Sequence, residues 1–212
     1  MRHYAGIAIL ALLTALAACS SNTVLVSVPP RMDLKSYGAL GIVEFASSEP
    51  GSAAHATRQF QEQVQASQPG TPFLELGDRR SVLAAVGAGE LDAATLRRIG
   101  EKYGVRAVFV GELVYSEPRV DVKIVDITKL QGGVRAEMRG DISSRLFDTA
   151  TGASIWSSSA WARRQVGNLH VSAERGISGG MSEANPRDEM MPALVYHLTQ
   201  DFRPTSMRQP AR

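Results

Sequence analysis

A serine, an aspartate and a histidine near the carboxyl end of the chain stand in the order that a hydrolase triad requires. Residues 176–180, GISGG, match the G-x-S-x-G motif with Ser178 as nucleophile, and Asp188 and His197 follow. That motif needs a buried strand turning sharply into a helix, yet a polar segment precedes it and an Asn-Pro pair delays the next helix. We therefore predict no catalytic residue and keep a serine hydrolase as the less favoured alternative.

The spacing of the histidines and glycines offers no metal or cofactor site. The four histidines are His3, His55, His170 and His197. No two of them stand three or four residues apart, as zinc ligands on one helix would. The Gly-Ala-Gly segment at residues 87–89 lacks a third glycine, and no Walker lysine motif occurs. We expect no cofactor and no metal, and the near balance of 23 basic and 21 acidic side chains gives no reason to expect nucleic acid as a partner.

Cys19 is the only cysteine and ends an apolar amino-terminal segment. A single cysteine excludes an internal disulfide and a cysteine-based zinc site. Arg2 and His3 precede residues 4–18, which are apolar except for one threonine. An apolar run this short is typical of a signal peptide and is too short for a comfortable membrane span.

The sequence Leu-Ala-Ala-Cys at residues 16–19 resembles the bacterial lipobox. The resemblance implies that residues 1–18 are a signal peptide and that Cys19 is acylated and becomes the mature amino terminus. Ser20 stands where an inner-membrane retention signal usually has aspartate, so the resemblance implies the periplasmic face of the outer membrane. Several acyl chains make such an anchor stable, because each buried methylene contributes about 0.8 kcal/mol.

The mature chain has the length of one domain with a short extension at each end. About 190 residues remain after signal cleavage, which suits a single hydrophobic core. We predict a tether at residues 19–34, in which Pro29-Pro30 favours extended polyproline geometry. An α/β domain at residues 35–203 follows, and residues 204–212 are expected to be a frayed basic tail.

Strands and helices alternate in the first half of the predicted domain. The expected elements are a strand at 37–45, a helix at 53–66, a strand at 73–76, helices capped by Asp78 and Asp92, and a strand at 105–114. The strand segments are nearly continuous apolar runs, which is typical of strands buried on both faces. This order indicates a layered α/β fold with right-handed crossovers.

Antiparallel strands are predicted from residue 120 onward. Apolar and charged residues alternate at 120–124 and at 136–146, and Gly132-Gly133 is the expected turn between them. Asp148 and Gly152 predict a hairpin turn, because aspartate can cap the turn and glycine accepts a positive φ.

A loop and a final helix are expected to complete the domain. Residues 163–183 are polar and rich in glycine, which predicts a mobile loop. Asn185-Pro186 then begins a helix, and its apolar stripe packs on the sheet or on a neighbouring subunit. The stripe comprises Met191, Leu194, Val195, Leu198 and Phe202.

The two tryptophans are the candidate partner surface. Trp156 and Trp161 differ by five positions, so in a regular strand they point to opposite faces. One of them is expected to close the core. The other is either an exposed contact residue or a half-buried strand residue.

Several of these segments together resemble a family of envelope lipoproteins. They are the lipobox, YGALGIVEF at 37–45, AVFVGEL at 107–113, LFDTATGASIW at 146–156, and the helix after ANP. They are similar to lipoproteins related to the curli-secretion channel lipoprotein, the penicillin-binding-protein activator lipoprotein and the amino-terminal domain of TolB. The resemblance covers residues 37–202 and implies an α/β fold, a mixed sheet with covering helices, in a protein without enzymatic activity.

The chain departs from the family in two places. Its tether is too short to imitate the long periplasmic linker of the activator type. In the channel type, residues 117–140 and 162–181 would be hairpins, but they lack sustained lipid-facing alternation, and each basic residue at mid-bilayer would cost about 2 to 4 kcal/mol.

We therefore expect a lipid-anchored periplasmic interaction or assembly module of the cell envelope. Its amino-terminal lipid binds the membrane, and its partner is another envelope protein or further copies of itself. A subunit of a curli-type outer-membrane secretion channel is the alternative.

Overall fold

The structure, a computed structural model, describes residues 23–49, 51–126, 131–172, 176–181 and 185–210. It divides the chain into two compact units, one of Met1–Pro30 with Pro204–Arg212 and one of Arg31–Arg203. No helix in these described ranges is long and apolar enough to cross a membrane.

The Arg31–Arg203 unit has the predicted α/β architecture. Its elements are η1 (Lys35–Tyr37), β2 (Leu40–Val43), β3 (Ala46–Ser47), α2 (Ser52–Ser67), β4 (Phe73–Gly77), α3 (Arg79–Ala85), α4 (Ala93–Tyr103), β5 (Ala107–Tyr115), β6 (Arg119–Asp126), β7 (Gln131–Asp148), β8 (Ser154–Ser172), β9 (Gly176–Met181), α5 (Pro186–Leu198) and η2 (Gln200–Phe202). The sheet runs in the order β4-β2-β5-β7-β8-β9, with β3 paired to β5 and β6 paired to β7. Strand β2 is parallel to β4 and β5, and the strands from β5 onward are antiparallel.

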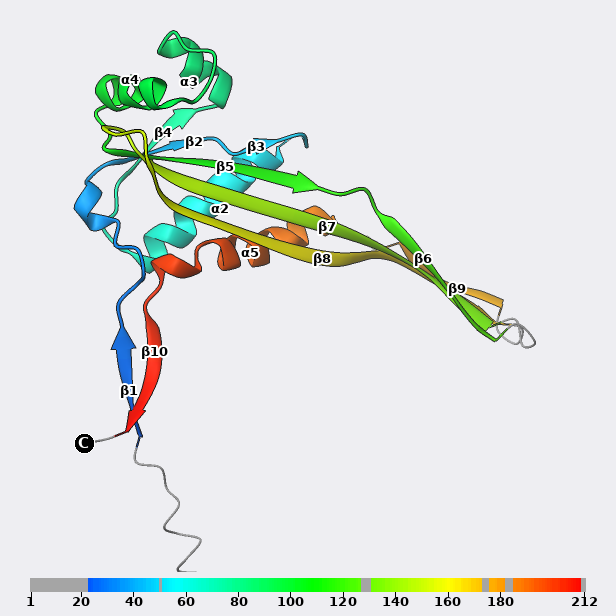
Figure 1. Cartoon of the computed structure of the whole chain (residues 1–212). Coiled ribbons are helices and arrows are strands. Elements are labelled where there is room, and N and C mark those ends of the chain that lie inside the picture. Colours follow the sequence, from blue (N-terminus) through cyan, green and yellow to red (C-terminus); the bar gives the residue numbers. More distant parts are fainter. Residues whose placement is uncertain (1–22, 50, 127–130, 173–175, 182–184, 211–212) are drawn as a thin grey trace, which may run out of the picture. The chain divides into compact units, whose positions relative to one another are not determined.

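The main core lies between one face of the sheet and the helices α2 and α5 (Figure 1). Phe109 of β5 is at its centre, with ring centroids 5.1 Å from Phe60, 5.8 Å from Trp156 and 5.9 Å from Phe202. The predicted apolar stripe of the last helix is buried here, with Phe202 contributed by η2. Because alternate residues of a strand face opposite sides, Val108 belongs to a second, smaller core beneath α3 and α4.

Local turn chemistry is as the sequence predicts. Asp78 caps α3 and Asp92 caps α4, and each accepts a hydrogen bond from a main-chain N–H three residues later, at 3.0 and 2.7 Å. Asp148 accepts a hydrogen bond from Thr151 N at 2.7 Å, and Gly152 has a φ of 77°. The hairpin between β7 and β8 is therefore closed as expected.

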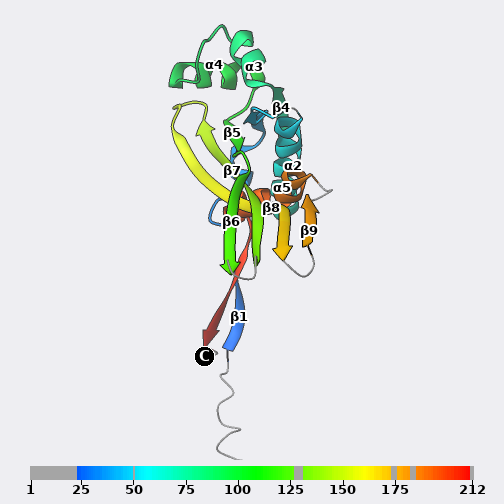
Figure 2. The same cartoon turned by 90° about the vertical axis from the view of Figure 1, so that its right-hand side faces the viewer.

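Two predictions in the second half were wrong. Gly132 and Gly133 do not form a turn: they lie within β7, opposite Ile124 and Lys123 of β6. The stretch 163–183 is not a loop over its described part, since β8 continues to Ser172 and β9 pairs with it (Figure 2). Main-chain pairing across neighbouring strands makes these segments regular although they are polar and rich in glycine.

The unit at the chain ends is a two-stranded ribbon. β1 (Thr23–Val28) pairs antiparallel with β10 (Thr205–Pro210). The sequence predicted a polyproline-like tether and a frayed tail here, because Pro29-Pro30 favours polyproline geometry and the residues of β10, apart from Met207 and Pro210, are polar and give no strand pattern. The main-chain hydrogen bonds of the ribbon need no such pattern.

Candidate functional site

The structure places Ser178 on a strand and the other two hydrolase candidates, Asp188 and His197, on a helix. Ser178 lies in the middle of β9, opposite His170 of β8, so no turn from strand to helix exists around it. Asp188 and His197 are on α5, where Asp188 Oδ1 is 3.8 Å from His55 Nδ1. The nucleophile elbow is therefore not formed. Within the described ranges, no group of three or more His, Cys, Asp or Glu side chains could hold a metal.

The two tryptophans point to opposite faces of the sheet, as predicted. Trp156 is 9% exposed, packs with its ring centroid 4.6 Å from Phe202, and donates a hydrogen bond from Nε1 to Asp201 Oδ2 at 3.2 Å. Trp161 is 56% exposed. Trp156 thus closes the core and Trp161 is the candidate contact residue. Cys19, the predicted lipid-attachment residue, lies outside the described residues.

Trp161 is exposed because the helices on its face of the sheet do not extend over it. α3 and α4 cover only the end of the sheet near β4 (Figure 1). Beyond them Val114 of β5 is 48% exposed on the same face. The open face continues across β7 and β8, where alternate residues are serine, arginine or aspartate around Trp161.

Two arginines pack against the Trp161 ring. The guanidinium carbons of Arg139 and Arg163 are 5.1 and 5.3 Å from a ring centroid, within cation–π range. Asp141, directly across from Trp161 on β7, accepts hydrogen bonds from Arg139 Nε at 2.8 and 3.0 Å. This hydrogen bonding raises the pKa of Arg139, so its charge is fixed. The cluster is a cationic and aromatic patch.

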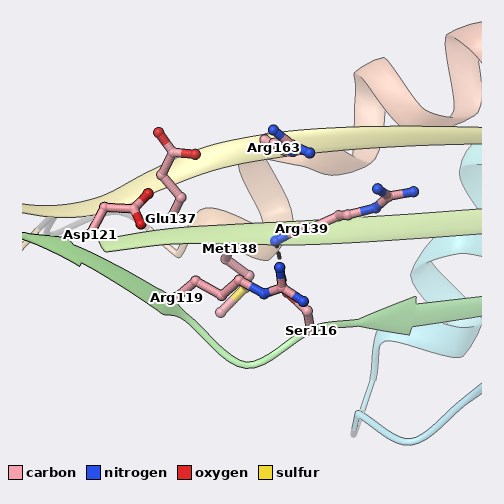
Figure 3. Close-up of a pocket in the computed structure, with 7 residues that line it drawn as sticks. All are labelled: Ser116, Arg119, Asp121, Glu137, Met138, Arg139 and Arg163. Carbon is pink, nitrogen blue, oxygen red and sulfur yellow. Dashed lines mark hydrogen bonds between the residues drawn. The ribbon is translucent and has the colours of Figure 1, made fainter. Parts of the chain in front are cut away.

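A groove of about 240 Å³ lies beside this patch (Figure 3). Its charged lining is three arginines and two carboxylates, Arg119, Arg139, Arg163, Asp121 and Glu137. Ser116 fixes one wall, because its Oγ accepts a hydrogen bond from Arg139 N at 3.1 Å. Mixed charges in an open groove suit a polar contact better than an apolar ligand.

The sheet continues past the helices as an arm of two hairpins (Figures 1 and 2). The name arm is used for β6, β9 and the residues of β7 and β8 that pair with them, 131–137 and 167–172. Among the described strands, β6 pairs with β7 alone and β9 pairs with β8 alone. Each therefore leaves one edge of the sheet free.

The register of the arm aligns residues of one kind in rows across its four strands. Three rows contain only apolar residues or glycine: Val120-Ala136-Gly167-Met181, Val122-Val134-Leu169-Gly179 and Ile124-Gly132-Val171-Ile177. The two rows between them contain only polar residues or glycine: Asp121-Arg135-Asn168-Gly180 and Lys123-Gly133-His170-Ser178. Successive rows belong to opposite faces of a pleated sheet, so the arm is amphipathic. Val120 and Val122 are 61% and 68% exposed, so the apolar face is open at β6.

No protein-family model matches the chain, and no curated protein sequence matches it. Among solved structures, the chain is similar to the PelC dodecamer from Paraburkholderia phytofirmans, with 13% identity over 85% of this chain and 97% of that chain and a TM-score of 0.41. It is also similar to the LpoB C-terminal domain from Salmonella enterica, with 13% identity over 59% of this chain and 82% of that chain and a TM-score of 0.36. A third is lipoprotein GNA1162 from Neisseria meningitidis, with 15% identity over 60% and 83% and a TM-score of 0.32.

Proposed function

We propose that this chain is a lipid-anchored, non-enzymatic assembly module of the bacterial envelope that works as an oligomer. The observation that supports it is the arm, whose rows alternate between apolar and polar residues and whose two edges pair with no other described strand. A free edge presents unpaired N–H and C=O groups, and an exposed apolar face marks a site of association. Joining β6 of one copy to β9 of the next would pair both edges.

The anchor in this proposal is the lipobox cysteine. Residues 16–19 supply the acylation motif, and Ser20 favours the outer membrane, so the module would work at its periplasmic face. Trp161 and its two arginines would then contact an envelope protein. Labelling with a clickable palmitate analogue, with Cys19→Ala as control, tests the anchor, and an unlabelled wild-type protein would reject it.

A subunit of a curli-type secretion channel is the second candidate. The charged residues of the arm would oppose contact with lipid only if they shared a face with its apolar residues. The register separates them into alternating rows, so joined arms would present one apolar and one charged face. That alternation is the pattern of strands that separate lipid from a water-filled lumen.

Disulfide crosslinking tests whether arms join edge to edge. Cys19 is the only native cysteine, so Asp121→Cys in β6 with Gly180→Cys in β9 introduces one thiol at each free edge. Within one copy these positions lie three strand spacings apart, about 14 Å, which is too far for a disulfide. A ladder of covalent multimers is expected from the double variant, and at most dimers from either single variant.

Native mass measurement of the acylated protein in detergent completes the test. A monomeric mass together with no crosslinked ladder would overturn the proposal. Reproducible conductance of the oligomer in planar bilayers would select the channel subunit, and an oligomer without conductance would select the assembly module. Hydrolysis of an ester or amide substrate that is lost in Ser178→Ala would contradict the non-enzymatic part.

A further inference from the structure

The ribbon of β1 and β10 carries an apolar face that is open to solvent. Its register places Val26 opposite Met207 and Val24 opposite Gln209, so these residues share one face. Val24, Val26 and Met207 are 49%, 37% and 54% exposed. On the other face, Leu25 is 70% exposed. Much of the apolar surface of the ribbon is therefore in contact with water.

A ribbon of this kind needs an additional contact to be stable. Two strands alone are marginally stable in water, because they bury little apolar surface. In the described part of its unit, the ribbon has no third strand and no helix. A surface that covers the valines and Met207 would supply the missing burial.

The position of the ribbon in the chain favours lipid as that surface. β1 begins at Thr23, four residues after Cys19. A chain of four residues spans at most about 13 Å, since an extended residue covers about 3.3 Å. If Cys19 carries lipid, as the proposed function requires, Thr23 lies within reach of the headgroup region, where amphipathic elements bind.

The charge of the ribbon points to lipid rather than to a second ribbon. Residues 20–30 and 204–212 contain no acidic side chain and two arginines, Arg208 and Arg212. Two such ribbons would bring like charges together, whereas an anionic bilayer surface attracts them. The Arg208 side chain is long enough to reach phosphate groups while the strand lies lower in the interface.

We propose that the β1–β10 ribbon is a membrane-docking element that lies against the bilayer beside the lipid anchor, with Val24, Val26 and Met207 at the acyl boundary. This inference rests on the acylation in the proposed function. It adds a second membrane contact, which would hold the chain ends at the membrane surface.

Vesicle flotation of a lipid-free chain tests the docking element. The mature chain with Cys19→Ser is mixed with vesicles of phosphatidylethanolamine and phosphatidylglycerol, and we expect it to float with them. Val24→Asn with Val26→Asn should weaken the partitioning about tenfold, the loss expected from the removed apolar surface. Ser27→Asn with Ser206→Asn, placed opposite each other on the other face, is the matched control and should float like the parent.

A spectroscopic readout covers the case in which the valine variant loses its ribbon structure. Met207→Trp places a reporter on the apolar face, and the emission that it adds to that of Trp156 and Trp161 should shift to the blue and be quenched by brominated lipid. Failure of the Cys19→Ser chain to float, or an unquenched reporter, would overturn the inference. So would vesicle-independent dimerisation that Val24→Asn with Val26→Asn abolishes, because the occupant would then be a second copy.

These outcomes are separable from those of the proposed function. A chain that is monomeric in detergent but still floats would reject oligomerisation and keep the docking element. An acylated oligomer whose Cys19→Ser form does not float would reject only the docking element.

Discussion

Gln68 donates a hydrogen bond from Nε2 to the main-chain oxygen of Phe202 at 3.1 Å, although 134 residues separate them. The same nitrogen donates to Met32 O at 2.6 Å, and Oε1 accepts from Leu34 N at 2.8 Å. Gln68 is 4% exposed, so water does not replace these partners. One side chain therefore ties together the first and last segments of the Arg31–Arg203 unit.

We expect Gln68→Ala to lower the free energy of unfolding by about 3 kcal/mol. The substitution leaves buried main-chain groups of three residues without a partner, and each such loss costs about 1 to 3 kcal/mol before relaxation. Urea denaturation followed by tryptophan fluorescence measures the change. Gln65→Ala is the control, because Gln65 is an exposed residue in the last turn of α2, three positions before Gln68, with only a 3.4 Å hydrogen bond. Equal losses in the two variants would contradict this assignment.

Gly111 in β5 is expected to tolerate no side chain. A Cβ at this position would lie 2.5 Å from ring atoms of Phe45, which is buried in the main core. Gly111→Ala should therefore destabilise the unit by about 1 to 3 kcal/mol, the usual range for overpacking. Gly89→Ala, where nothing lies within 4 Å, should have little effect in the same thermal unfolding experiment. A Gly111→Ala variant as stable as Gly89→Ala would show that the Phe45 ring can move aside.

The different surroundings of the two tryptophans predict different fluorescence. Trp156→Phe leaves Trp161, whose emission should be red-shifted and readily quenched by iodide, since the ring is exposed beside two guanidinium groups. Trp161→Phe leaves Trp156, whose emission should be blue-shifted and protected. An envelope partner that uses the Trp161 patch should protect only the first variant from iodide. Iodide quenching of Trp161 that stays unchanged when the partner binds would place the contact elsewhere.

The sequence predicted those parts of the fold that depend on local chemistry. Asp78, Asp92 and Asp148 cap main-chain groups within three residues, so their effect is visible in a short segment. The opposite orientation of Trp156 and Trp161 follows from the two-residue period of a strand.

The features that the sequence did not predict depend on register between distant strands. The amphipathic rows of the arm are complete only when four strands are aligned. The one local signal for the end of β8 was the alternation of apolar and polar residues at 167–172. Arg163 is two positions from Trp161, but Arg139 reaches it only through β7–β8 pairing. The link from Gln68 to Phe202 likewise has no local signature.

The hairpin turn between β7 and β8 should make stability depend on acid pH. Hydrogen bonds from the Thr151 hydroxyl and from Thr151 N hold the pKa of Asp148 below its ordinary value of 3.8. A carboxylate with a lowered pKa in the folded state stabilises that state above pH 3.8, and this contribution is lost as the pH falls through the folded-state pKa.

Asp148→Asn keeps an oxygen acceptor but cannot titrate. The stability difference between wild type and Asp148→Asn, measured by urea denaturation, should therefore be constant near neutral pH and shrink below about pH 4. Thr151→Val removes the hydroxyl donor and should reduce that dependence on pH, whereas a difference that stays constant down to pH 2 would show that Asp148 does not titrate in this turn.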